Sequence, residues 1–273
     1  MRERLAAKRG SAPRHARPEL YPTLAKFKPG IDFTGEVARS CMHCHMIGTA
    51  ERETWRRERK PLPDDVLFPW PMPDVIGMRL DPGERATVLE VAGGSAAANA
   101  GLRAGDRIVE LAGQPLLSIA DVQWVLHRAP DPASLDAVVS RGDAIERVRV
   151  ELASGWRRRG DISWRTTSWD LRRMVTGGLL LVELPQRDRA RSKIAADGLG
   201  LLVEHVGEYG EHRTAKDAGF RKGDIVVEWD GRSDRWRETE ILAHGMQKRR
   251  AGERIAVTVL RDGKRVAFEL LMR

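Results

Sequence analysis

The stretch AGLRAGDRIVELAG at residues 100–113 decides the fold, because the chain repeats it. At residues 218–231 the sequence reads AGFRKGDIVVEWDG, and eight of the fourteen positions are identical. In both copies an Ala-Gly pair is followed by a second glycine, an aspartate and an apolar run. Repetition of this kind is typical of a supersecondary unit that is used more than once. The sequence therefore predicts the same small module twice.

The glycines in the repeat have a conformational reason. Gly101 and Gly219 follow short helical stretches, where a residue with positive φ commonly ends a helix. Gly105 and Gly223 stand in the turn that leads into the apolar run, and glycine adopts such turns without steric cost. Each copy is therefore predicted to contain a helix end, a tight turn and a strand.

The same order of elements surrounds both copies. Short apolar runs separated by glycine turns predict strands, and apolar residues on one face predict helices. In the first module we expect helices at 96–100 and 119–128, and strands at 75–80, 86–92, 107–112, 135–140 and 145–152. In the second we expect a helix at 237–248 and strands at 199–206, 224–229, 254–261 and 264–272.

The repeated Ala-Gly-x-x-x-Gly-Asp motif, with its apolar strand and the following Gly113 or Gly231, resembles the PDZ domain. The likeness is to the permuted form found in bacterial periplasmic proteases. The resemblance implies an α+β chain with two small PDZ-like β-barrels, each capped by two helices. The preceding segment is expected to be short and mainly helical or irregular. The expected boundaries are 1–74 for this basic segment, 75–152 for the first module, 153–195 for a Trp/Arg-rich linker and 196–273 for the second module.

The resemblance also implies a binding site in each module. PDZ domains add an extended peptide as a strand to a sheet edge, and a glycine-containing loop captures its C-terminal carboxylate. The expected loops are Ile76-Gly77-Met78-Arg79 and Gly198-Leu199-Gly200-Leu201. The last peptide side chain would rest against the long helix, on Val122, Val125 and Leu126 or on Ile241 and Leu242. The alternative is that a groove is vestigial or filled by the chain itself.

The two cysteines of the chain form a second motif, Cys41-Met42-His43-Cys44-His45. This C-x-x-C-H spacing is the one by which c-type haem is attached, with Cys41 and Cys44 as thioether links and His45 as the proximal ligand. Met72, in a proline-rich stretch, is the predicted distal ligand, since methionine sulfur often completes the haem of electron-transfer proteins. The alternatives are a disulfide, zinc or Cu(I) at the same residues.

The motif followed by two PDZ-like modules is similar to the C-terminal part of bacterial thioredoxin-like/PDZ selenoproteins, without their thioredoxin-like domain. Haem attachment implies a periplasmic or otherwise extracytoplasmic protein. The N-terminal residues are charged and show no apolar signal sequence. We therefore expect the chain to be a fragment that has lost its targeting end.

Composition narrows the function classes. A chain of 273 residues predicts about two domains, and 41% hydrophobic with 32% charged residues is too polar for a membrane protein. The net charge of +8 lies mainly outside the two modules, and no nucleic-acid motif accompanies it. No G-x-S-x-G or comparable nucleophile motif is present, so we predict no protease activity and only haem could carry an enzymatic function.

These observations predict an extracytoplasmic, haem-bearing PDZ adaptor that binds protein C-termini or extended peptides and transfers electrons to a redox partner. The alternative is a peptide-binding scaffold or protease-regulatory protein without haem. In that case Cys41 and Cys44 would form a disulfide or a metal site.

Overall fold

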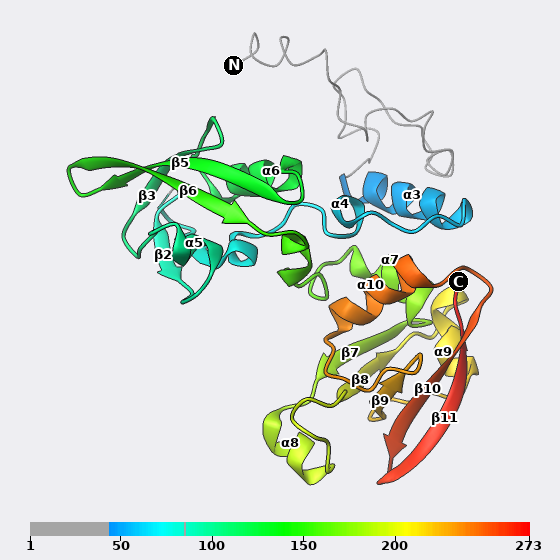
Figure 1. Cartoon of the computed structure of the whole chain (residues 1–273). Helices are drawn as coiled ribbons and strands as arrows, with labels where there is room; N and C mark the ends of the chain where they lie inside the picture. Colours follow the sequence, from blue (N-terminus) through cyan, green and yellow to red (C-terminus); the bar gives the residue numbers. More distant parts are fainter. Residues whose placement is uncertain (1–43, 85) are drawn as a thin grey trace. The chain divides into compact units, whose positions relative to one another are not determined.

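The structure, a computed structural model, describes residues 44–84 and 86–273, which form two compact units (Figure 1). Residues 67–161 form one unit, which we call the central unit. Residues up to 66 combine with residues 162–273 in the other, which we call the terminal unit. Each unit has its own sheet and helices.

The central unit contains two open antiparallel sheets. Strands β1 (Met78–Leu80) and β2 (Val88–Val91) pair with each other. A four-stranded sheet has the order β4-β3-β5-β6, and a bridge between Thr87 and Arg107 connects the two sheets. Its strands are β3 (Arg107–Leu111), β4 (Gln114–Pro115), β5 (Ala133–Arg141) and β6 (Ala144–Leu152). The helical elements are η5 (Pro73–Ile76), α5 (Ala96–Asn99), α6 (Ile119–Arg128) and η6 (Trp156–Arg159).

The alternation of buried and exposed residues explains strand β5, and a capping box explains where helix α6 begins. Along β5 the buried residues alternate with more exposed ones, as expected for a strand with one face on the core. Helix α6 begins with a capping box in which the Asp121 carboxylate accepts from the backbone N–H of Ser118 at 2.9 Å. The capped helix turns one apolar face into the core of the central unit.

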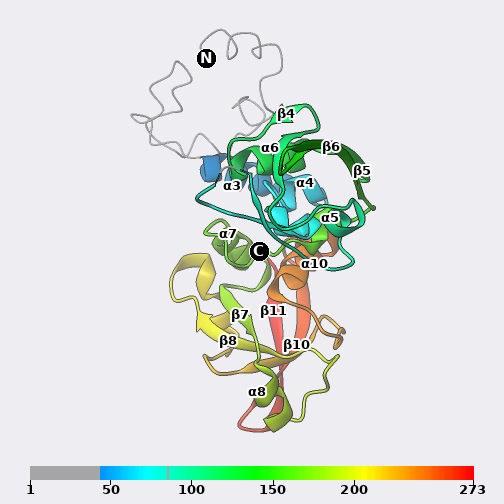
Figure 2. The ribbon, with the colours of Figure 1, turned by 90° about the vertical axis from the view of Figure 1, so that its left-hand side faces the viewer.

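The terminal unit contains one antiparallel sheet of order β11-β10-β9-β8-β7. Figure 2 shows β7, β8, β10 and β11 side by side. The strands are β7 (Leu179–Glu183), β8 (Leu201–Val206), β9 (Ile225–Trp229), β10 (Arg254–Arg261) and β11 (Lys264–Leu271). Helices α7 (Ser168–Val175) and α10 (Glu238–Lys248) pack against each other. The other helical elements are α3 (Cys44–Arg57), α8 (Gln186–Arg191), η7 (Gly210–Arg213) and α9 (Thr214–Asp217), while α4 (Asp64–Leu67) spans the sequence boundary between the two units.

The predicted α+β class is confirmed, but two details differ. The sheets of the described residues do not close into barrels. The stretch predicted as a linker supplies α7 and β7 to the terminal unit, because Leu179 and Leu181 are buried in its core. The segment expected to be mainly helical or irregular contains α3 in its described part, and residues 1–43 lie outside the described residues.

The repeated motif builds the same turn in both units. In the central unit the Asp106 carboxylate accepts from the backbone N–H of Arg103 at 2.8 Å. It also accepts from Nε and Nη2 of Arg141 at 2.8 and 2.9 Å, and Nη2 donates to the carbonyl of Gly101 at 2.9 Å. Asp106 is 1% exposed, so the charge it buries is balanced by a bidentate partner.

The terminal unit reproduces every one of these bonds. Asp224 accepts from the backbone of Arg221 at 2.9 Å and from two nitrogens of Arg261 at 2.7 Å each. Arg261 Nη2 donates to the carbonyl of Gly219 at 2.8 Å. We call this arrangement the Asp–Arg clamp. It joins the turn to the strand that follows the long helix.

The clamp predicts an acid-dependent stability. Hydrogen bonds from Arg141 and from the Arg103 amide hold the pKa of Asp106 below its usual 3.8. A carboxyl whose folded-state pKa is depressed stabilises the fold above the unfolded pKa, and that stability is lost as the pH falls through the folded value. We expect Asp106→Asn to be less stable than the parent at pH 7. We expect this difference to shrink as the pH falls below about 4.

Urea denaturation at a series of pH values measures this difference. Asp136→Asn is the control, because Asp136 is 74% exposed in its ion pair with Arg149, and exposed pairs contribute about 0–1 kcal/mol. A gap between Asp106→Asn and the parent that stays constant from pH 7 to below pH 3 would contradict the clamp.

Candidate functional site

Among the described strands, β1 pairs only with β2, so its other edge has no partner strand. The Gly77 carbonyl accepts from the Ala92 N–H at 2.8 Å, and the Asp81 N–H donates to the Thr87 carbonyl at 2.8 Å. These bonds fix which residues face β2. In an antiparallel pair the residues between them point their main-chain groups the other way. The N–H and C=O groups of Met78 and Leu80 therefore face the open edge.

The side chains of β1 do not occupy that edge, so only main-chain groups are presented there. Met78 and Leu80 are 1% and 3% exposed and belong to the core of the central unit. Arg79 points to solvent, where its Nη2 donates to Glu90 at 2.8 Å. An extended segment that docks here would therefore meet backbone donors and acceptors before it met side chains.

The loop before β1 requires glycine. Gly77 has a φ of +84°, and a Cβ placed there would lie 2.0 Å from Cβ of Ser95. The Gly77 N–H donates to the Asp74 carbonyl at 2.9 Å and closes the turn of η5, while Ile76 is buried beside it. The Gly77 amide is thus already used, so the Met78 amide is the first one that faces the free edge.

The predicted helix residues of α6 belong to the core. Val122, Val125 and Leu126 are 0%, 7% and 0% exposed, so they do not form open surface. On the same helix Ile119 and Gln123 remain half-buried. Gln123 Nε2 donates to the carbonyl of Trp70 at 3.1 Å, which anchors the proline-rich stretch to α6.

In the terminal unit the predicted loop Gly198-Leu199-Gly200-Leu201 lies before β8, and β8 is an interior strand. Leu201 pairs with Glu183 of β7 on one side and with Val226 of β9 on the other. The Leu199 N–H donates to the Ser233 carbonyl at 2.6 Å. The carbonyls of Gly198 and Gly200 accept from Arg189. These residues therefore have no free edge to offer.

The edge strand of the terminal unit that corresponds to β1 is β7. Its glycine is Gly178, whose carbonyl accepts from the Gly207 N–H at 3.0 Å, as Gly77 accepts from Ala92. Gly178 has a φ of +93°, and a Cβ there would lie 2.0 Å from the His212 carbonyl oxygen. By this correspondence Leu179 and Leu181 occupy the places of Met78 and Leu80.

The β7 edge is sealed by the chain's own side chains. The Leu181 N–H donates to Oε1 of Glu238 at 2.8 Å, and the Thr176 hydroxyl donates to the Leu179 carbonyl at 2.8 Å. Arg172 Nε donates to Oε1 of Glu238 at 2.9 Å. The Arg172 and Glu238 side chains are 2% and 1% exposed, so they form a buried ion pair over the strand edge.

A residue of helix α10 explains why these contacts close the edge of β7 and not that of β1. Both long helices begin with a capping box, which aligns Asp121 with Glu240 and hence Ile119 with Glu238. Ile119 has no acceptor for the Leu80 amide. Ile241 and Leu242, predicted to line the second groove, are both 0% exposed, and α7 packs on α10.

Sequence reasoning missed Gly178, Arg172 and Glu238. The available signal was the Gly177-Gly178 pair, which stands before an apolar run just as Gly77 does. The Arg172–Glu238 pair joins residues 66 positions apart, and no local pattern announces it.

The haem prediction is not tested by the described residues. Cys41 lies outside them, and Cys44 and His45 begin α3 with side chains that are not described. Met72 is half-buried just before η5, in the central unit. Among the side chains that are described, no group of three or more His, Cys, Asp or Glu could hold a metal. No helix in the described part is long and apolar enough to cross a bilayer.

Comparison with known proteins places a PDZ domain in the central unit. The sequence pattern that defines the PDZ domain family matches residues 87–141. No curated protein matches the chain.

Solved structures give local matches. One is a variant of the HtrA-type protease AlgW with a decapeptide, at 20% identity over 36% of this chain and 28% of that one, with a TM-score of 0.30. Another AlgW structure with a decapeptide matches at 14% identity over 53% and 50%, with a TM-score of 0.32. The HtrA3 PDZ domain bound to a phage-derived ligand matches at 26% identity over 28% and 81%, with a TM-score of 0.25. The chain thus spans well under two thirds of the two protease chains.

The seal on β7 makes a testable contribution to stability. Glu238→Ala leaves Arg172 buried without its partner, so we expect it to lower the free energy of unfolding of the terminal unit by about 3–5 kcal/mol. The double variant Arg172→Met/Glu238→Leu removes both charges and should recover most of that loss. Urea denaturation measures both.

The matched control is Glu204→Ala, which breaks the exposed pair with Lys222 and should cost at most about 1 kcal/mol. If Glu238→Ala were as mild as this control, the ion pair would not hold the edge closed.

Proposed function

We propose that the central unit is a PDZ module that binds an extended peptide as an added strand along β1. The observation that carries this proposal is the edge of β1 at Met78 and Leu80, because the helix position that holds Glu238 in the terminal unit is Ile119 here, which has no acceptor. Main-chain hydrogen bonds supply affinity in this mode of recognition, and neighbouring side chains supply specificity. The match of residues 87–141 to the PDZ domain family supports it.

The geometry favours strand addition over capture of a chain terminus. Carboxylate capture needs several free amides in the loop, and the Gly77 amide already closes the turn of η5. Met78 and Leu80 offer two amides in strand register instead. A peptide can therefore dock through its main chain whether or not it ends at this point.

We further propose that the terminal unit is a second PDZ-like module whose groove is closed. The Asp–Arg clamp, the edge glycine and the capped long helix recur in it, which supports a shared architecture. The Glu238 carboxylate and the Thr176 hydroxyl occupy the positions where peptide groups would bind. The terminal unit then acts as a scaffold, and the whole chain is a binding protein with one open peptide site.

Peptide selection tests the open site. A phage-displayed library of random heptapeptides is panned against the full chain, and the enriched heptapeptide is synthesised with a fluorescent label. We expect Ile119→Glu, which places at α6 the carboxylate that seals β7, to weaken binding by at least about tenfold, the equivalent of 1.4 kcal/mol. Fluorescence polarisation gives the dissociation constants.

The control is Ile145→Glu, because Ile145 is 65% exposed on β6. It makes the same chemical change away from β1 and should leave the affinity within about twofold. Amidation of the peptide C-terminus should cost less than about tenfold if the main chain carries recognition. Failure to enrich any peptide, or equal losses in both variants, would overturn the proposal.

Haem attachment at Cys41 and Cys44 is a separate proposal that rests on the C-x-x-C-H spacing alone. When bound, the haem would supply one-electron transfer, and His45 would hold its iron. The chain is expressed behind an export signal with a cytochrome c maturation system. We expect Soret and α bands that survive denaturation and vanish in Cys44→Ala. A colourless wild-type protein would sink this proposal and would leave the peptide site untouched.

A further inference from the structure

The terminal unit contains a cationic cavity that peptide binding does not use. It measures about 140 Å³ and lies where the end of α3 and the turn after it meet the end of α10. Among the described residues, six cationic side chains and no acidic one line it: Arg56, Arg59, Lys60, Lys248, Arg249 and Arg250. A water molecule needs only about 10–15 Å³ of such space, so the cavity has room for a tetrahedral oxyanion.

Arg56 builds the cavity. Its Nε donates to the carbonyl of Arg273 at 2.7 Å, and its Nη1 donates to the carbonyl of Arg249 at 2.6 Å. These bonds fix the end of α10 against α3. Nη2 is buried and has no acceptor among the described residues. Burial lowers the pKa of Arg56 to about 10, and the charge of Glu253 opposes this shift.

Nearby carboxylates compensate only part of the charge. Lys60 pairs with Glu58 at 2.8 Å, and Arg249 pairs with Asp230 at 2.7 Å. Glu253 lies 3.8 Å from Arg249. Six cations thus face three neighbouring carboxylates. A single carboxylate ligand would balance one of the three excess charges, whereas a dianion would balance two of them.

Arg59 follows α3 in the left-handed conformation. Its φ is +55°, in the region that a glycine usually occupies after a helix. The Arg59 N–H donates to the Arg56 carbonyl at 3.0 Å, and the Lys60 N–H donates to the Trp55 carbonyl at 3.1 Å. This turn places the Arg59 side chain in the lining of the cavity.

We propose that this cavity binds a phosphate monoester or free phosphate as a dianion. Arginine presents paired N–H donors that match phosphate oxygens, and lysine adds a point charge. The phosphate oxygens would contact Arg59, Lys248 and Arg250. The phosphate would also stabilise the buried charge of Arg56, because opposite charges attract more strongly in surroundings of low dielectric. The proposal does not depend on the peptide site.

The test uses the full chain and titrates inorganic phosphate or O-phosphoserine by calorimetry at constant ionic strength, because added salt screens weak electrostatic binding. We expect saturable binding that Lys248→Ala/Arg250→Ala weakens at least about tenfold. Binding of both probes indicates a phosphorylated residue as ligand, and binding of phosphate alone indicates the free ion. Arg59→Gly should weaken binding while raising the urea midpoint, because glycine relieves the strained turn.

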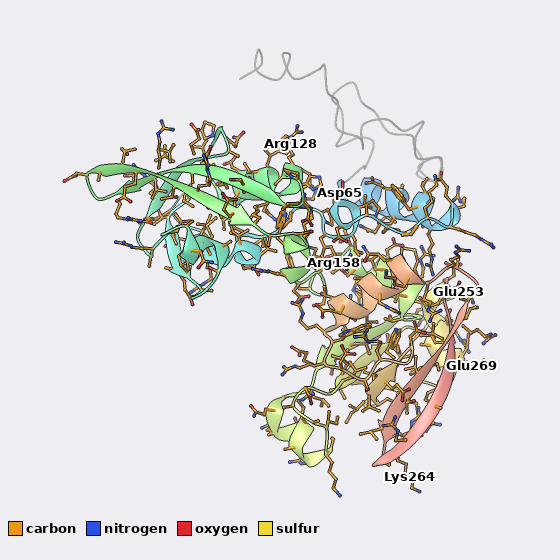
Figure 3. All side chains as sticks on the ribbon, viewed as in Figure 1. Asp65, Arg128, Arg158, Glu253, Lys264 and Glu269 are labelled. Carbon is orange, nitrogen blue, oxygen red and sulfur yellow. The ribbon has the colours of Figure 1, made fainter. Side chains whose placement is uncertain are left out.

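The control is Arg221→Ala/Lys264→Ala, which removes the same charge from exposed sites of the same unit. Figure 3 shows Lys264 at the opposite end of the β10–β11 hairpin from Glu253. An eight-residue strand puts these ends about 25 Å apart. Absence of saturable binding, or equal weakening by the control, would overturn the proposal and assign the cluster to general surface charge.

Discussion

The main-chain N–H and C=O groups at the edge of a strand need hydrogen-bond partners, and the two units meet this constraint in opposite ways. In the terminal unit the Leu181 amide and the Leu179 carbonyl find internal partners in Glu238 and Thr176. In the central unit the corresponding groups of β1 face away from β2, and the helix position that matches Glu238 is Ile119. A buried donor without an acceptor costs about 1–3 kcal/mol, so an open edge is stable only while solvent or a peptide reaches it. The proposed function depends on this difference.

The two units share the features that position these two strands, β1 and β7. The Asp–Arg clamp ties the turn of each repeat to the strand after the long helix, and a glycine with positive φ begins each edge strand. The clamps at Asp106 and Asp224 differ by no more than 0.2 Å in corresponding bonds. The two units differ at one helix position, Ile119 against Glu238. The closed edge of β7 also needs Arg172 to balance the buried charge and Thr176 to bind the Leu179 carbonyl.

The sequence predicted the parts of the fold that local chemistry controls. Glycine turns and alternating apolar residues located most strands, and helix α6 was expected at residues 119–128, where it lies. The second binding loop was expected at Gly198 to Leu201, but it leads into β8, which lies between β7 and β9. The seal on β7 depends on a pairing across 66 residues, which periodicity does not encode.

Amide hydrogen exchange, measured residue by residue with and without the selected heptapeptide, tests the central claim most directly. The free chain should show a protected Leu181 amide and fast exchange at Met78 and Leu80, because only Leu181 has an internal acceptor. Saturating peptide should slow Met78 and Leu80 by at least about tenfold and leave Leu181 unchanged. Protection that appears at Leu181 on peptide addition, with Met78 and Leu80 unaffected, would contradict the account.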